Sequence, residues 1–239
     1  MSSLKQIKLY AVSGCLFLAA ANAFAQPIVY TSTEYTTFAS IDLGSNTSGL
    51  LSKTNPPDPL PLLSTAVLAD SGNSSSASGS ANTGQFNVST ETVSSNLFAA
   101  ATSGAGFSGR FMGTGQRVDF KVDYGTSDDS FGGLGGSQLF VTLLSNGVTL
   151  FDQIFSESAL IQQSFILSSG STNLFDIQLI SNAEAQGSVD NISLGSNIAS
   201  AAFSVNAAPV PEPGVIWLML GGLGLLGIKR RKASSASRE

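Results

Sequence analysis

The sequence predicts an all-β protein: a single antiparallel β-sandwich or jelly-roll-like domain, flanked by an N-terminal signal peptide and a C-terminal transmembrane helix. Short apolar segments with alternating polarity recur from Gln85 onward, separated by turn residues and without intervening amphipathic helices. Such spacing is typical of two-layer antiparallel sheets. An apolar run beside basic residues lies at each end of the chain. We therefore expect segments 1–25, 26–208 and 209–232 to be the signal peptide, the exported domain and a sorting signal.

The first segment has the three parts of a secretory signal. Lys5 and Lys8 precede an apolar run over residues 9–20, and Ala23-Phe24-Ala25 supplies a small-x-small cleavage site. About twelve apolar residues reach about 18 Å as a helix, which is short of a roughly 30 Å hydrocarbon core. We therefore predict cleavage after Ala25, with lipoprotein processing at residues 12–15 (VSGC) as the alternative.

Two segments give the clearest strand patterns. Residues 117–124 alternate strictly between charged and apolar side chains, which predicts a strand with one buried face. Its other face carries Asp119, Lys121 and Asp123 as a solvated charge ladder. Residues 139–155 predict a hairpin, because Asn146-Gly147 suits the positive φ angles of a type I′ turn.

The remaining elements follow from shorter patterns. Further strands are expected around Phe86, Val88 and Phe107, at 165–167, at 175–179 and, as the closing strand, at 189–194. Residues 156–163 predict one short helix. Four prolines within 56–61 predict an extended connector, and the polar low-complexity run 71–84 predicts a flexible, protease-sensitive loop. Segment 56–84 is therefore expected to be loop and low-complexity chain.

Composition excludes several functions. The chain has no histidine and one cysteine, Cys15, which lies inside the signal peptide. Residues 26–208 hold four basic against fourteen acidic residues, a net charge of −10, which would repel a nucleic-acid backbone. No pair of carboxylates stands out as a catalytic dyad. We therefore predict no enzyme, no catalytic residue, no cofactor, no metal site and no nucleic-acid partner.

Three motifs have a ligand-binding interpretation beside a structural one. Residues 104–109 match G-x-G-x-x-G, but no helix pattern follows them, so a flexible loop between strands is expected. Asp128-Asp129 and Asp190-Asn191 carry oxygen ligands of the kind that calcium prefers. Solvated turns explain both pairs as well, because Asp and Asn side chains bond to nearby backbone.

Three ordered elements mark the C-terminal segment. Val210-Pro211-Glu212-Pro213 comes first, followed by the uncharged span 214–228 and by the basic cluster Lys229, Arg230, Arg231 and Lys232. Fifteen helical residues reach about 22 Å, a short membrane span. The basic cluster is expected to stay cytoplasmic, which places the preceding domain outside.

These elements resemble the PEP-CTERM sorting signal of Gram-negative bacteria. The resemblance implies recognition and cleavage by exosortase, a membrane protease, after an inner-membrane intermediate held by the C-terminal helix. It also implies a final place at the cell surface or in the extracellular biofilm matrix. The expected function is that of a non-catalytic exported protein sorted to this surface or to the extracellular polysaccharide matrix.

Two other functions remain open. A lectin-like carbohydrate-binding module is the first, with extracellular polysaccharide as its partner. The exported domain has no tryptophan on which a sugar ring could stack, because Trp217 lies in the span. An ice-binding protein is the second, and the flat Thr-rich repeat that would support it is missing from the sequence.

Overall fold

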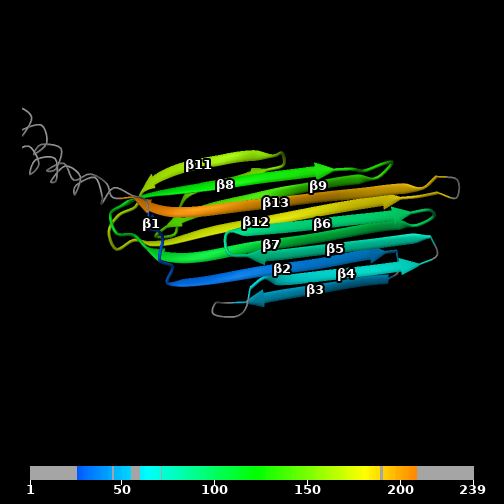
Figure 1. Cartoon of the computed structure of the whole chain (residues 1–239), viewed down its shortest axis with the longest axis horizontal. Coiled ribbons are helices and arrows are strands. Elements are labelled where there is room, and N and C mark those ends of the chain that lie inside the picture. Colours follow the sequence, from blue (N-terminus) through cyan, green and yellow to red (C-terminus); the bar gives the residue numbers. More distant parts are fainter. Residues whose placement is uncertain (1–25, 45, 55–59, 71, 189–190, 209–239) are drawn as a thin grey trace, which may run out of the picture. The chain divides into compact units, whose positions relative to one another are not determined.

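The computed structural model describes residues 26–44, 46–54, 60–70, 72–188 and 191–208. Within these ranges every regular element is a strand (Figure 1). The predicted signal peptide, the sorting motif, the membrane span, Asp190 and most of the Pro-rich connector lie outside the described residues.

Seven of the strands form sheet A. Their bounds are β1 Gln26–Pro27, β4 Leu62–Asp70, β5 Asn73–Asn82, β6 Gln85–Ser94, β8 Arg117–Asp128, β11 Ala159–Ile166 and β13 Ser193–Ala208. The spatial order is β11-β8-β13-β6-β5-β4, and β1 pairs with the last residues of β13. The first described strand therefore lies beside the strand that leads into the C-terminal segment.

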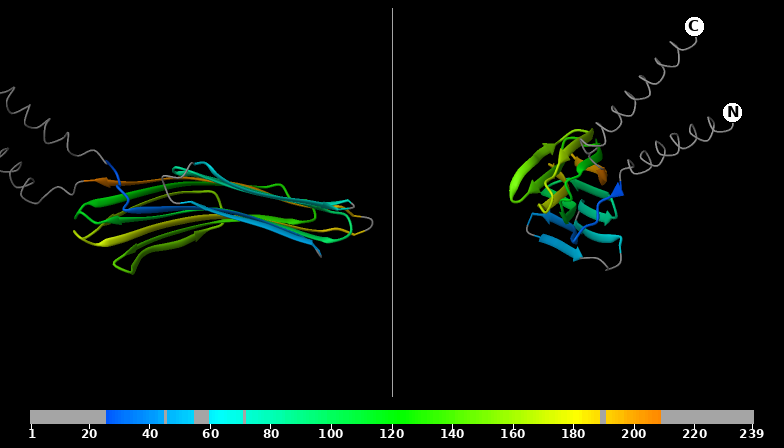
Figure 2. Two further views of the ribbon diagram at one scale, coloured as in Figure 1. Left: turned by 90° about the horizontal axis from the view of Figure 1, so that it is seen from below. Right: turned by 90° about the vertical axis from the view of Figure 1, so that its left-hand side faces the viewer.

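The other six strands form sheet B. Their bounds are β2 Ser32–Leu43, β3 Asn46–Thr54, β7 Phe98–Met112, β9 Leu134–Ser145, β10 Val148–Phe155 and β12 Thr172–Gln186. The order is β10-β9-β12-β7-β2-β3. Both sheets are antiparallel, and Figure 2 shows them as two layers. The expectation of an all-β, two-sheet antiparallel fold is confirmed.

Aromatic side chains fill the space between the sheets in one half of the sandwich. Phe86 and Phe120 of sheet A are at most 2% exposed, as is Phe175 of sheet B. The Phe120 ring centroid lies 5.6 Å from that of Phe175. Burial of each such side chain stabilises the fold by about 1.5–3 kcal/mol, so this cluster holds the two layers together.

Small and hydroxylated side chains fill the other half. Ala39, Ala66 and Ala77 belong to a second, smaller buried cluster. There the Thr37 and Ser64 hydroxyls, one from each sheet, share a hydrogen bond of 2.7 Å. Because these side chains are short and the two hydroxyls bond to each other, the sheets can approach closely at this point without leaving either hydroxyl unsatisfied.

The two clearest strand predictions are confirmed. Residues 117–124 lie in β8 with their apolar side chains buried. The hairpin of β9 and β10 turns at Asn146 and Gly147, with φ values of 50° and 78°, and Val148 pairs with Ser145. Strands were also expected around Phe86, Val88 and Phe107, and these residues lie in β6 and β7.

Two predictions in the polar segments are wrong. Within segment 56–84, expected as loop, residues 62–70 form β4 and residues 73–82 form β5, in which Ser75, Ala77, Gly79 and Ala81 face inward and the alternate serines face outward. Residues 104–109, expected as a loop, lie inside β7, so their glycines are strand residues. In both segments small side chains serve close packing between strands and sheets, which outweighs their weak strand preference.

Two further boundaries are corrected. The short helix expected at 156–163 is absent, and Ala159–Ile166 forms the edge strand β11 on β8. The closing strand is β13, which begins at Ser193 rather than at residue 189. Ser188 and Asn191 instead exchange two backbone hydrogen bonds of 3.0 Å.

Candidate functional site

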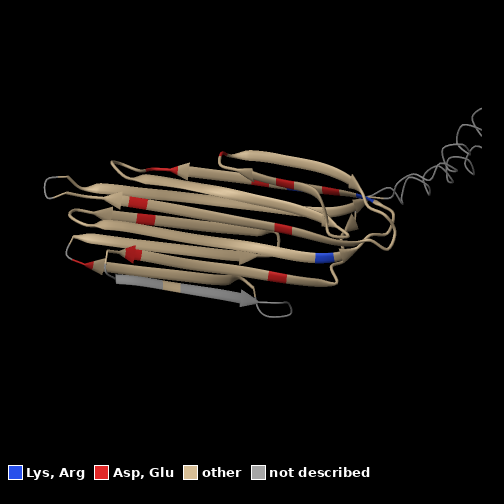
Figure 3. Cartoon of the chain, turned by 180° about the vertical axis from the view of Figure 1, so that it is seen from behind, with Lys and Arg blue, Asp and Glu red and all other residues tan. Residues whose placement is uncertain are grey.

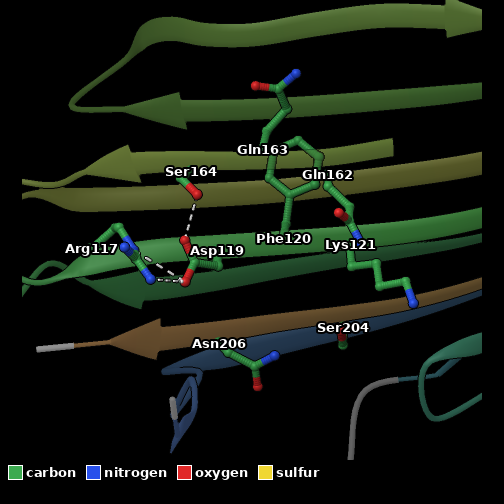
Figure 4. A pocket seen from close by; sticks show the side chains of 9 residues that line it. All are labelled: Arg117, Asp119, Phe120, Lys121, Gln162, Gln163, Ser164, Ser204 and Asn206. Carbon is green, nitrogen blue, oxygen red and sulfur yellow. Dashed lines mark hydrogen bonds and ion pairs between the residues drawn. The ribbon is translucent and has the colours of Figure 1, made fainter. Parts of the chain in front are cut away.

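A polar groove of about 640 Å³ opens on the outer face of sheet A, over β11, β8 and β13. We call it the β8 groove. It is lined by Arg117, Asp119, Phe120, Lys121, Gln162, Gln163, Ser164, Ser204 and Asn206 (Figure 4). Its volume falls in the range of about 300–1,000 Å³ that is usual for ligand sites. A second hollow, of about 360 Å³ beside Ser137 and Glu184, also falls in this range, but it contains no basic side chain.

Strand register assembles this groove. In the antiparallel pair of β8 and β11, Lys121 lies opposite Gln162 and Asp119 lies opposite Ser164. Alternation along β8 turns both charged side chains away from the core, because their neighbours Val118, Phe120 and Val122 point inward. The sequence predicted the charged face of β8 but missed β11, and with it the contribution of Gln162 and Ser164.

A short hydrogen-bonded chain fixes one wall of the groove. Nε and Nη2 of Arg117 donate to Oδ2 of Asp119 at 3.2 and 2.9 Å, and the Ser164 hydroxyl donates to Oδ1 at 2.6 Å (Figure 4). Burial raises the pKa of the Asp119 carboxyl. The hydrogen bonds from Ser164 and Arg117 and the Arg117 charge together lower this pKa by more, so the net shift is downward. Asp119 therefore stays ionised and holds the guanidinium in place at neutral pH.

Donor groups remain free on the positive side chains. Arg117 has five N–H donors, and two hydrogen bonds to Asp119 leave the others available to a ligand. Lys121 makes no ion pair with any residue that the structure describes. Acidic residues are spread over several strands whereas basic ones are few (Figure 3), so two cations in one groove are a local exception.

Aromatic surface is missing from the groove. The Phe120 ring is 2% exposed and packs in the core, and Figure 4 shows Phe120 and Gln163 pointing to the opposite side of the strands from Lys121 and Asn206. Ser204 and Asn206 of β13 complete the lining with short polar side chains. The groove can therefore recognise a ligand by hydrogen bonds and charge, and not by ring stacking.

Sheet B carries a second polar feature, a row of alternating acids and hydroxyls across five strands. In strand register the row runs Glu34, Ser108, Asp176, Thr142 and Asp152. Burial, opposed by a hydrogen bond from Ser108 and assisted by the Glu34 charge, raises the pKa of Asp176. The hollow beside Glu34 and Asp176 has only about 190 Å³, too little for the usual ligand site.

The structure describes only one of the two pairs for which calcium binding was an interpretation beside a solvated turn. Oδ1 of Asp128 accepts hydrogen bonds from the Ser130 backbone N–H at 3.0 Å and from the Ser130 hydroxyl at 2.6 Å, which makes the turn after β8. Asp190 lies outside the described residues. Among the residues that the structure describes, no three metal-ligating side chains gather in one place.

The sorting and cleavage residues were predicted from sequence alone. Ala23 and Ala25, the motif Val210 to Pro213 and the basic cluster 229–232 all lie outside the described ranges, so their roles stay predictions. Across the described residues, no helix has the length and apolarity to cross a bilayer. The predicted span 214–228 lies outside these ranges.

The fold and the groove together define a class of protein: a two-sheet antiparallel β protein with a polar, weakly cationic groove. A family model then adds the particular assignment: the PEP-CTERM protein-sorting motif matches residues 209–233. The chain carries this motif directly after β13, which ends at Ala208. The motif implies export, membrane-associated sorting and processing by an exosortase-type membrane protein. No curated protein sequence matches the chain.

Solved structures share only a distant likeness. TmCBM61 in complex with beta-1,4-galactotriose has a TM-score of 0.24 and 8% identity, over 55% of this chain and 86% of that one. The arabinose-bound MgGH51 α-L-arabinofuranosidase has a TM-score of 0.24 and 13% identity, over 60% of this chain and 23% of that one. The GH31 α-xylosidase of Xanthomonas citri has a TM-score of 0.20 and 9% identity, over 79% of this chain and 19% of that one. Likenesses of this size carry no functional argument.

Proposed function

We propose that this protein is a non-catalytic component of the cell surface or extracellular matrix, exported through its signal peptide and released from the inner membrane by exosortase. The observation that carries the proposal is the sorting motif at 209–233, placed immediately after the last strand of a self-contained β domain. A tail in this position can be removed without cutting into any strand of either sheet.

The non-catalytic part of the proposal rests on chemistry. The exported region lacks histidine and cysteine, so carboxylates would have to do any acid–base work. Asp119 is committed to Arg117 and Ser164, and Asp176 to Ser108 beside a small hollow. Asp119 thus lies in the β8 groove as the partner of Arg117 and Ser164, and the hollow beside Asp176 is small, so neither is placed as one of the two carboxylates that flank the bond in glycoside hydrolysis.

Expression of the full chain in matched hosts with and without an exosortase tests the sorting step. With exosortase, the protein should lose its C-terminal segment and leave the inner-membrane fraction. Without it, the longer form should stay in that fraction. An identical size and location in both hosts would favour a plain membrane anchor instead.

Signal removal gives a separate prediction. Exported protein should begin at Gln26, because Ala23 and Ala25 supply the small residues that signal peptidase requires. Ala25→Leu should slow this cleavage strongly, whereas Gln26→Asn should leave it unchanged. N-terminal sequencing checks both variants, and a mature chain that begins at Cys15 would show lipoprotein processing instead.

A further inference from the structure

We propose that the β8 groove binds an anionic, carboxylate-bearing polysaccharide. This inference rests on the proposed function, because it names a matrix partner for a protein sent to the surface. The groove contains Arg117 and Lys121, which are two of only four basic residues in the segment 26–208. Its net charge with Asp119 is +1, whereas the segment as a whole carries −10.

The arrangement of donors suits a polymer with carboxylates along it. Arg117 and Lys121 are four residues apart on one face of β8, about 13 Å along the strand, so they can contact successive charged groups. Charge-assisted hydrogen bonds from Arg and Lys to carboxylates are roughly twice as strong as neutral ones. The two cations thus give the groove a preference for carboxylate-bearing polysaccharides over neutral ones.

Amide and hydroxyl groups fill the intervals between the cations. Gln162 and Asn206 offer amides that both donate and accept, and Ser204 offers an exposed hydroxyl. These groups match the hydroxyls of a sugar chain. A neutral glycan would need an aromatic platform for comparable affinity, and the groove has none because Phe120 is buried.

Asp119 acts here as a positioning residue. It takes two hydrogen bonds from Arg117 and one from Ser164, so the guanidinium is oriented before a ligand arrives. Such preorganisation reduces the entropy lost on binding. Asp123 is exposed on the same face of β8, so the ligand is expected to lie on the Arg117 side of Lys121, toward Asn206 and the end of β13.

Binding of the full chain in detergent to immobilised polygalacturonate, with neutral dextran as comparison, tests the proposal. We expect binding to polygalacturonate and none to dextran. Lys121→Gln and Arg117→Gln should each weaken binding at least about fivefold, because each removes a hydrogen bond to a charged group. Arg110→Gln is the matched control: it removes one exposed charge from β7 of sheet B and should change nothing.

Three results would overturn the proposal: equal binding to dextran, no binding to polygalacturonate, or the same loss with Arg110→Gln. Vesicles of anionic phospholipid form a further arm, and stronger binding to them than to polygalacturonate would identify a membrane-headgroup site instead. Thermal unfolding of each variant shows that the fold is intact. The experiment does not depend on tail cleavage, so its failure would leave exosortase sorting untouched.

Discussion

Replacement of Pro211 and Pro213 by Ala should leave export intact and block processing, so that the uncleaved chain accumulates in the inner membrane. Proline lacks an N–H and disfavours helical backbone in the residue before it, so the Pro-Glu-Pro segment is expected to stay extended and open to a protease. With alanine in both places, the helix of the span could extend backward through the cleavage region. The expected loss of the processed form is nearly complete.

Fractionation and mass measurement in an exosortase-containing host check this result. Pro209→Ala is the matched control, since it removes a neighbouring proline but keeps Pro-Glu-Pro, and it should be processed like the wild type. Replacing residues 229–232 with Ser should fail differently, by weakening retention or orientation of the span. Release of the Pro211→Ala, Pro213→Ala variant like the wild type would show that the motif does not direct sorting.

Sequence patterns predicted the strands whose two faces differ in chemistry. Val118, Phe120 and Val122 alternate with charged residues, so periodicity alone located β8 and its exposed face. In β5 the inward residues are Ser, Ala and Gly and the outward ones are Ser, so the two faces look alike. Hydrophobic periodicity carries no signal for such a strand, and only the opposing sheet decides which face is buried.

The groove was predictable only in part. The sequence places Arg117, Asp119 and Lys121 on one face of one strand. It does not indicate that Gln162 and Ser164 lie opposite them, because the adjacent glutamines at 162 and 163 break the alternation of an edge strand. The contribution of Asn206 depends on β13 lying beside β8, a pairing between segments far apart in the chain.

The close approach of the sheets makes Gly79 of β5 sensitive to substitution. A Cβ atom there would lie 2.4 Å from the backbone oxygen of Gly104 in the opposite sheet, and 3.0 Å from that of Phe38. Neither oxygen belongs to a flexible side chain, so the sheets themselves would have to move apart. Gly79→Val should therefore lower the free energy of unfolding by about 3 kcal/mol, the upper part of the usual range for overpacking.

Gly136→Val supplies the matched control. Gly136 is also inside a strand, β9, neither glycine has a positive φ, and no atom lies within 4 Å of the Cβ that Gly136 would gain. Valine there should be neutral or stabilising by about 0.5–1 kcal/mol, because glycine weakens strands through its conformational entropy. Urea unfolding of the two full-length variants in detergent measures the difference. Equal stability of both variants would contradict this close contact between Gly79 and Gly104. It would mean that the two sheets are farther apart at β5 and that residues 73–82 contribute little to the core.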